Sequence, residues 1–374
     1  MKQIKKAVYK ALNKLNANGY EAYLVGGAVR SLLLGTEIKD YDITTSATPV
    51  VVRHLFNEYP QYRVGEKHGT VVVNIDRTKI DITTFRSDGE YEDHRKPLSV
   101  TFSDDLLEDL KRRDFTVNAL CLDKDDDLID EVGGKQDLDD RLIRAIGDPK
   151  TRFYEDALRI LRALRFTAKL DFTIEKQTEK AMYECKDLLE YISNERKKDE
   201  LLQILSVRNR RKVINDYLEI FDTFIPFKKT DEKIDEFSNE YYALAYLLSN
   251  TEGYDLKKLK FSRQEIHLIE ALIEAGNADL EKDYDFIELL CDPLAKDILT
   301  YLNELTGEDY SERYKKLKKA MVTRDTLKVN GQDLMELGYK GRSIGKIQDE
   351  LVELIRHQLL PNNKKSLLKY LSLK

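Results

Sequence analysis

The sequence predicts an α+β fold, with a small α/β region near the N-terminus and helices over most of the remainder. Short apolar runs alternate with helical patterns between residues 21 and 86, which is typical of a small sheet with helices between its strands. From Phe153 onward, Leu, Ile, Lys and Glu recur at three- and four-residue spacing, and strand patterns become rare. The 374 residues are enough for several domains, and a charged content of 35% indicates a heavily solvated surface.

The first elements follow from apolar runs and the residues that bound them. Residues 1–20 have the pattern of an amphipathic helix, and residues 22–25 that of a short apolar strand. Residues 28–34 predict a helix that ends at Gly35, because glycine is common just after a helix. The next strand is expected at residues 40–44.

A second helix and two further strands complete this α/β region. Thr48 is a favourable N-cap and Pro49 suits the first helical position, which predicts a helix over residues 50–59. Two β-rich runs, residues 70–75 and 79–85, predict strands joined by a short polar turn.

Two aspartates one residue apart, Asp40 and Asp42, are the most informative feature for chemistry. Residues i and i+2 of a strand point to the same face, so both carboxylates are expected to project together. Such hard oxygen ligands suit Mg²⁺, which binds one or two carboxylates together with substrate phosphates. The glycine turn that starts at Gly26 and Gly27 lies upstream and lets backbone N–H groups approach an anion. Together these features predict a nucleoside-triphosphate site with metal-assisted phosphoryl transfer.

Asp81 is a third carboxylate on an expected strand, between Ile80 and Ile82. Aspartate is disfavoured in strands, so this position needs an explanation. Solvent exposure on a polar face is one explanation. If its strand lies beside residues 40–44, Asp81 is instead able to complete the metal cluster or to deprotonate an attacking hydroxyl.

Two arginine-rich segments are candidates for nucleotide recognition. Arg112 and Arg113 precede Asp114 and Asn118, an arrangement that suits either a surface ion-pair set or contacts to phosphate, base and ribose.

The second segment places four charged residues at three-residue steps, Asp156, Arg159, Arg162 and Arg165. That spacing predicts a stripe along one side of a helix, which is either a surface ladder of ion pairs or a set that reads a base. A carboxylate accepts from an exocyclic amine and a guanidinium donates to ring acceptors, so one Asp–Arg pair selects CTP and ATP over UTP and GTP.

Composition bounds the partners and the compartment. Residues 311–374 carry 15 Lys and Arg against 7 Asp and Glu, although the whole chain has a net charge of −6. This basic region is either a solvated helical surface or a region that binds phosphate groups locally. No apolar run is long enough to span a membrane, and three widely spaced cysteines favour a reducing, cytoplasmic compartment.

Five motifs in order resemble those of the class II tRNA nucleotidyltransferases, the family of CCA-adding enzymes and bacterial poly(A) polymerases. They are LVGGAVRSLLLG with KDYDITT, then IDITTFR, RRDFTVNAL, GDPKTRFYEDALRILRALRF and SNERKKDEL. A weaker similarity returns over residues 329–351. One departure is Ser31, which stands where the family usually has Asp.

The resemblance implies a role for each matching position. Asp40 and Asp42 match the metal-binding pair, here expected to hold Mg²⁺, and Asp81 matches the acidic position that assists them. Glu195 and Arg196 match a motif that braces the base-reading helix. The nucleotide-binding positions are Gly26, Gly27, Arg30, Arg113, Asp114, Asp156, Arg159, Arg162 and Arg165.

The resemblance also implies an architecture and an activity. A polymerase-β-like nucleotidyltransferase head is expected at residues 1–146, a helical neck at 147–206, a helical body at 207–270 and a helical tail at 271–374. The implied activity is addition of C, C and A to the 3′ end of tRNA from CTP and ATP, with the tail holding the tRNA elbow and no membrane partner.

Four alternatives to CCA addition follow from the sequence. One is a small-molecule nucleotidyltransferase, which would share the glycine turn and the two aspartates but would not need the charged stripe of residues 156–165 or a basic helical tail. The family motifs are shared by enzymes that add only A and by poly(A) polymerases, so both remain open. A full-length segment at residues 86–109, which resembles the family's flexible loop, favours an enzyme able to add A. A catalytically silent RNA-binding module is disfavoured because both aspartates of DYD are present.

Overall fold

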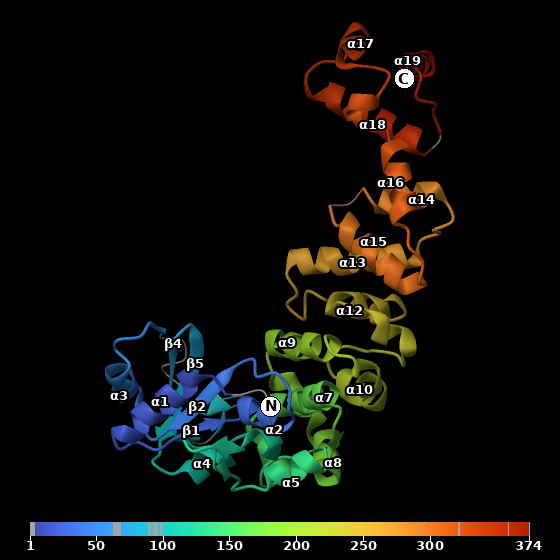
Figure 1. The fold of residues 1–374 in the computed structure, drawn as a ribbon. Helices are drawn as coiled ribbons and strands as arrows, with labels where there is room; N and C mark the ends of the chain where they lie inside the picture. The colour runs from blue at the N-terminus through green and yellow to red at the C-terminus, as the bar shows by residue number, and fades with distance from the viewer. Residues whose placement is uncertain are drawn as a thin grey trace. The chain divides into compact units, whose positions relative to one another are not determined.

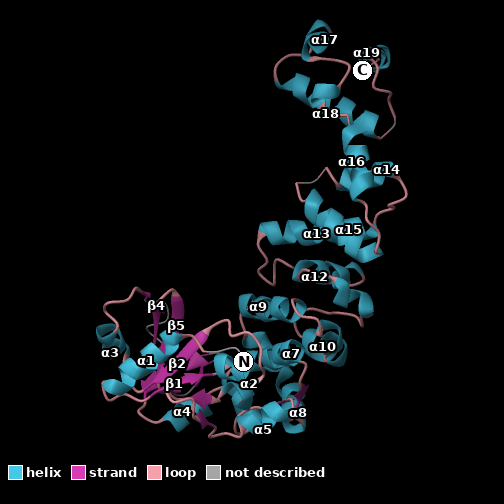
Figure 2. Cartoon of the chain, in the orientation of Figure 1, coloured by secondary structure: helices cyan, strands magenta, loops and turns pink. Residues whose placement is uncertain are grey.

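The computed structural model describes residues 4–62, 69–88, 91–92, 96–97, 100–291, 293–320, 322–357 and 359–373. The chain forms two compact units. The first comprises Met1–Asp235 with Thr251–Phe261, and the second comprises Glu236–Asn250 with Ser262–Lys374. In the described residues all strands belong to the first unit and the second is helical (Figures 1 and 2). The α+β class expected from the sequence is confirmed.

A seven-stranded sheet forms the centre of the N-terminal part of the first unit. Its order is β11-β10-β1-β2-β5-β4-β3, and β2 and β5 are parallel neighbours whereas the other pairs are antiparallel. The strands are β1 (Ala22–Val25), β2 (Tyr41–Thr45), β3 (Gln61–Tyr62), β4 (Thr70–Ile75), β5 (Thr78–Thr84), β10 (Cys121–Leu122) and β11 (Leu128–Ile129). The parallel pairing aligns the two acidic strands at the same level.

Helices and short strand pairs surround this sheet and extend the unit. Helix α7 packs against α9, and α6 packs against α8. The helices are α1 (Lys6–Ala17), α2 (Gly27–Leu33), α3 (Pro49–Leu55), α4 (Leu106–Lys111), α5 (Gly134–Asp139), α6 (Pro149–Glu155), α7 (Leu158–Leu170), α8 (Lys176–Cys185), α9 (Asn194–Leu205), α10 (Arg210–Asp216) and α11 (Leu218–Phe221). The strand pairs are β6 (Arg86–Asp88) with β9 (Val100–Phe102), β7 (Tyr91–Glu92) with β8 (Lys96–Pro97), and β12 (Leu142–Ile143) with β13 (Thr173–Ile174).

The predicted strands are found to within one residue, and one helix prediction fails in part. Asp40, expected inside the second strand, precedes β2 (Tyr41–Thr45). Strands β1 and β4 have the expected bounds. Helix α3 begins at Pro49 as expected but ends at Leu55 rather than Tyr59. Tyr59 precedes Pro60, a position that disfavours helical backbone. Part of the expected flexible loop, residues 89–90, 93–95 and 98–99, lies outside the described residues.

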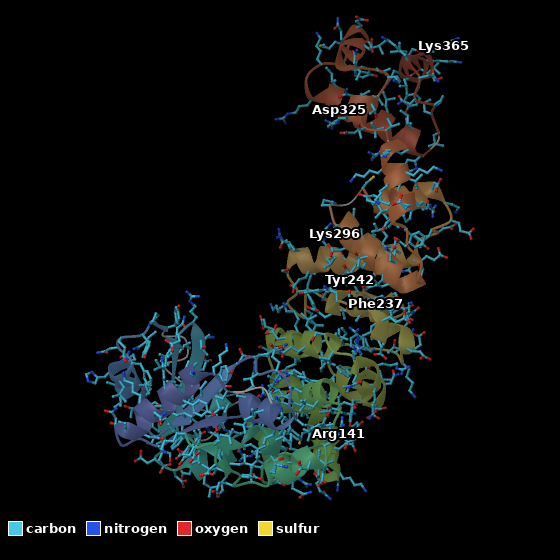
Figure 3. The ribbon with its side chains drawn as sticks, in the orientation of Figure 1. Arg141, Phe237, Tyr242, Lys296, Asp325 and Lys365 are labelled. Atoms are coloured by element: carbon cyan, nitrogen blue, oxygen red, sulfur yellow. The ribbon has the colours of Figure 1, made fainter. Side chains whose placement is uncertain are left out.

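The second unit consists of helices with their own buried cores. An aromatic group joins Phe237 and Tyr242, both labelled in Figure 3, to Tyr301, with ring centroids 5.4 and 5.8 Å away. The helices are α12 (Glu240–Ser249), α13 (Arg263–Asn277), α14 (Asp283–Leu289), α15 (Ala295–Thr306), α16 (Ser311–Ala320), α17 (Gly331–Glu336), α18 (Arg342–Arg356) and α19 (Lys364–Ser372).

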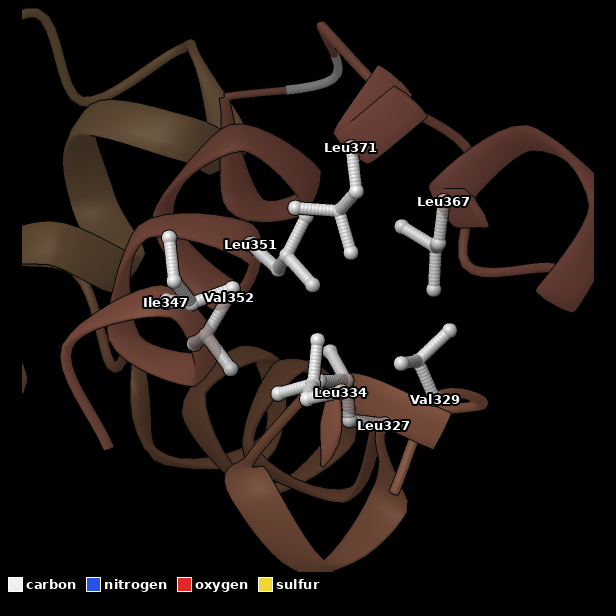
Figure 4. Close-up of a cluster of buried hydrophobic side chains, with 8 residues drawn as sticks. All are labelled: Leu327, Val329, Leu334, Ile347, Leu351, Val352, Leu367 and Leu371. Carbon is white, nitrogen blue, oxygen red and sulfur yellow. The ribbon is translucent and has the colours of Figure 1, made fainter. Parts of the chain in front are cut away.

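A separate apolar core lies at the C-terminal end of the chain (Figure 4). It brings together side chains from α17, α18, α19 and the segment before α17, namely Leu327, Val329, Leu334, Ile347, Leu351, Val352, Leu367 and Leu371. Among the described residues, no helix is both long and apolar enough to cross a bilayer.

Candidate active site

A glycine turn joins β1 to α2 at the start of the site. Gly26 has φ 74° and ψ −127°, a backbone conformation that side chains with a Cβ rarely adopt. Its N–H donates to the Leu120 carbonyl, 3.2 Å away. The turn is followed on α2 by Arg30, whose guanidinium donates to Asn118 and lies 5.0 Å from the centre of the Phe166 ring.

The two acidic strands bring Asp42 and Asp81 side by side. In the parallel pairing of β2 with β5, Asp42 is directly opposite Asp81, and Asp40 is exposed just before β2. Asp42 keeps an exposed surface but stands in a concave part of the site. The protein around it displaces water and raises its pKa to about 6, and the charges of Asp81 and Asp40 contribute further.

The donor set of this corner fits a hard divalent cation. Asp40, Asp42 and Asp81 offer only carboxylate oxygens, the ligands that Mg²⁺ prefers. In the part of the chain that the structure describes, no three Asp, Glu, His or Cys side chains lie close enough to form a metal site by themselves. A cation here would therefore use one or two carboxylates and take its remaining ligands from substrate and water.

One cavity of about 530 Å³ gathers most of the expected site residues. Nine cationic side chains and three carboxylates line it, so it suits a polyanionic ligand. The lining residues are Gly26, Gly27, Arg30, Asp42, Arg86, Arg112, Arg113, Asp114, Asn118, Asp156, Leu158, Arg159, Arg162, Arg165, Phe166, Lys169 and Arg196. Asp40 and Asp81 lie outside this lining.

Asp109 connects the acidic strand β2 to two arginines of the cavity. Its fully buried carboxylate accepts from Arg112 at 2.7 and 2.9 Å and from Arg113 at 3.0 Å. It also accepts from the Thr44 hydroxyl at 2.9 Å, two residues after Asp42. Burial alone would raise the pKa of Asp109, but Arg113 and Arg112 hold it below the ordinary value. Asp109 therefore stays charged and fixes both guanidinium groups.

Asp114 plays the same part for the side of the cavity lined by α7. It accepts from Arg162 at 2.6 and 2.8 Å, from the Asn118 amide at 2.9 Å and from the Phe115 N–H at 2.8 Å. Burial opposes its charge, but Arg162 and these hydrogen bonds outweigh burial and lower the pKa of Asp114 to about 2.

The expectation that Asp156 shares one helix with the three arginines is wrong. Asp156 has extended backbone, φ −142° and ψ 101°, and lies between α6 and α7. Its side chain accepts from the Leu158 N–H at 3.1 Å, which satisfies a free donor at the start of α7. Arg196 of α9 donates to both of its oxygens, at 2.8 and 3.3 Å. Arg196 therefore braces this junction, in agreement with the sequence interpretation.

The arginines of α7 are each held by a carboxylate from another turn or element. Arg159 donates to Glu155 at 2.7 Å and to the Arg112 carbonyl at 2.8 Å. Arg165 donates through Nε to Glu200 of α9 at 2.6 Å, and its guanidinium lies 4.3 Å from the centre of the Phe166 ring. Among the described residues, no hydrogen bond engages the terminal nitrogens of Arg165, which are therefore available to a ligand.

Comparisons with known proteins cover both units of the chain. The Poly A polymerase head domain family matches residues 22–144, the RNA and SrmB-binding site of polymerase A matches 171–220, and tRNA nucleotidyltransferase domain 2 matches 232–371. The CCA-adding enzyme of Bacillus pumilus is 36% identical, with 96% of this chain and 95% of that protein covered. The chain belongs to the family of CCA-adding tRNA nucleotidyltransferases and poly(A) polymerases.

Other relatives support the same assignment. The CCA-adding enzyme of Geobacillus thermodenitrificans is 51% identical over 195 residues, which cover 52% of this chain and 48% of that protein. A crystal structure of the Bacillus stearothermophilus CCA-adding enzyme in complex with CTP is 30% identical, with a TM-score of 0.79 and with 100% of this chain and 98% of that chain covered.

Several residues of the site were not singled out from the sequence, among them Asp109, Glu200, Phe166 and Lys169. Asp109 and Glu200 read as charged positions on helix surfaces, and Phe166 reads as core, so their sequence context gives no sign of the cavity. Lys169 lies seven residues after Arg162 and continues the arginine spacing, which is the one signal that was available.

Proposed function

We propose that this chain adds C, C and A to the 3′ end of tRNA, using CTP and ATP and releasing pyrophosphate. The observation that carries the proposal is the cavity in which ten of the expected nucleotide and metal residues meet: Gly26, Gly27, Arg30, Asp42, Arg113, Asp114, Asp156, Arg159, Arg162 and Arg165. Its net positive lining suits a triphosphate, and the relatives that match both units are named CCA-adding enzymes.

The catalytic corner is assigned to three aspartates. Asp40 and Asp42 would hold Mg²⁺, which supplies neutralisation of the triphosphate charge when bound. Asp81, which lies opposite Asp42 on the neighbouring strand, would accept the proton of the tRNA 3′-hydroxyl as that oxygen attacks the α-phosphate. Arg30, held by Asn118, would orient the phosphates of the nucleotide.

Base selection is assigned to the junction between α6 and α7. Each carboxylate oxygen has two lone pairs, so Asp156 is able to accept from the exocyclic amine of cytosine or adenine while Arg196 holds it. Arg159, Arg162 and Arg165 provide the guanidinium donors for ring acceptors. Protein groups thus replace a nucleic-acid template.

The tRNA-binding region is proposed from its charge, and the cellular location from the absence of disulfides among the three cysteines. The basic residues 311–374 are proposed to hold the tRNA elbow through its phosphates. A cytoplasmic location is proposed because none of the three cysteines is in a disulfide.

The direct test offers the purified protein three tRNAs, which end before CCA, after C and after CC. Each is incubated with CTP, with ATP and with both, and the products are sequenced. Extension of all three to CCA, and no further, supports the proposal. Addition of A alone to the tRNA ending in CC, or an open-ended A tail, assigns the protein to the other activities of the family.

A further inference from the structure

The cavity contains a lysine, Lys169, whose ammonium group has no protein partner among the described residues. Lys169 lies in the last turn of α7, four residues after Arg165 and seven after Arg162, so it continues the same face of the helix. It lines the cavity and is exposed to solvent. Within the described residues, no hydrogen bond or ion pair engages its ammonium group.

At least seven of the other eight cations of the cavity are held by a protein group, which is a carboxylate for six of them and the Asn118 amide for Arg30. Arg112 and Arg113 are held by Asp109, Arg162 by Asp114 and Arg165 by Glu200. Arg30, Arg159 and Arg196 also have partners, namely Asn118, Glu155 and Asp156.

The charges around Lys169 are mostly of its own sign. Although Lys169 keeps an exposed surface, the protein around it displaces part of its water and lowers its pKa, repulsion from Arg30, Arg165 and Lys39 lowers it further, and Asp40 opposes this shift. Such a concentration of positive charge is unfavourable until an anion joins it.

The lining of the cavity around Lys169 indicates where that anion would lie. In a nucleoside triphosphate the ribose separates the base from the α-phosphate, and the β- and γ-phosphates extend beyond the α-phosphate. Arg30 follows the glycine turn assigned to the phosphates, and Lys169 lines the same cavity. Arg30 and Arg165, four residues before Lys169, both lie against the Phe166 ring, at 5.0 and 4.3 Å from its centre.

We propose that Lys169 is a substrate-binding residue that holds the triphosphate tail of the incoming CTP or ATP. The inference rests on the proposed function, since it uses the same cavity. Its ammonium group donates charge-assisted hydrogen bonds to phosphate oxygens and makes no contribution to the choice of base.

A structural role at the end of the helix is the competing explanation. A cation in the last turn interacts favourably with the helix dipole, by about 0.3–1 kcal/mol. Under that explanation, replacement of Lys169 changes stability and leaves ligand binding as it was.

The test compares Lys169→Gln and Lys169→Arg with the wild type, and uses Lys180→Gln on α8 as a control lysine outside the cavity. Calorimetry measures binding of inorganic tripolyphosphate, CTP and tRNA, and thermal melting monitors the fold. Lys169→Gln is expected to weaken tripolyphosphate and CTP binding about tenfold with tRNA binding unchanged. Lys169→Arg is expected to restore most of the affinity, and Lys180→Gln to match the wild type.

Three results would overturn the inference. They are wild-type tripolyphosphate binding by Lys169→Gln, a loss confined to tRNA binding, and a change in melting temperature alone. Because tripolyphosphate binding does not require nucleotide addition, a wild type that binds it but fails to extend tRNA would refute the proposed function and not the role of Lys169.

Discussion

At the scale of single residues, the site is built from arginines whose positions are fixed by buried acids. Asp109 and Asp114, both buried, accept from guanidinium groups that line the cavity. The ring of Phe166 is shared by three arginines as a cation–π partner. Arg30, Arg162 and Arg165 lie 5.0, 5.6 and 4.3 Å from its centre. Fixed donors lose less freedom when a ligand binds, which favours selectivity.

Asp156→Ala tests the assignment of base selection. Loss of the carboxylate that accepts from the exocyclic amine is expected to reduce the preference for CTP over UTP by about 10- to 100-fold. Nucleotide competition in the tRNA extension assay measures the ratio. A variant that rejects UTP as strongly as the wild type would remove Asp156 from the selection mechanism.

Asp114 provides a prediction for the pH dependence of stability. Its folded-state pKa of about 2 lies below its ordinary value of 3.8, so its stabilising effect is present above about pH 4 and is lost as the pH falls toward 2. Asp114→Asn is therefore expected to lower the free energy of unfolding by on the order of 2 kcal/mol at pH 7. Urea unfolding of both proteins should give a constant difference between pH 7 and 5 and a shrinking one below pH 4. A difference that is independent of pH would contradict the ion-pair account.

At the scale of elements, the turn between β1 and α2 determines where Arg30 points. Gly26→Ala places a Cβ in a backbone conformation with φ 74°, at a cost of about 1–3 kcal/mol. The expected result is a shifted turn and a rise of about tenfold in the KM for CTP. Gly19→Ala is the matched control, because Gly19 also has a positive φ but lies outside the cavity lining. Equal effects of both variants on KM would show that the turn has no specific role.

Elements with local signals could be predicted, whereas elements set by distant contacts could not. The apolar run of β1 and the Thr48–Pro49 start of α3 gave correct bounds because these patterns act within a few residues. The helical backbone is interrupted at Asp156, whose side chain contacts Arg196 forty residues away, whereas spacing alone indicated one continuous helix. The sequence predicted the proximity of Asp42 and Asp81 only on the condition that their strands are neighbours, because strand order is a property of the whole sheet.

At the scale of the whole molecule, the proposed nucleotide site and the basic region proposed to bind tRNA belong to different units. The cavity lies within the first unit, while the basic residues 311–374 belong to the second. The four-part division into head, neck, body and tail remains a prediction, because the structure separates the chain into two compact units only.

Neutralisation of α16 tests the proposed role of the basic region. Its four exposed lysines, Lys315, Lys316, Lys318 and Lys319, are changed together to Gln. If they contact phosphates, tRNA affinity should fall by about tenfold or more, with a weaker dependence on salt, while CTP binding is retained. Filter binding at several salt concentrations measures both quantities, and an unchanged salt slope would exclude α16 from the RNA contact.

The most direct measurement of the central claim is nucleotide incorporation by Asp42→Ala, with Asp222→Ala as an exposed control in the same unit. Loss of this carboxylate is expected to reduce transfer of both C and A by about 10³-fold or more, because several kcal/mol of charge stabilisation depend on it. Binding of tRNA should stay near the wild-type value in both variants. Transfer by Asp42→Ala at the rate of Asp222→Ala would contradict the catalytic assignment of the β2–β5 corner.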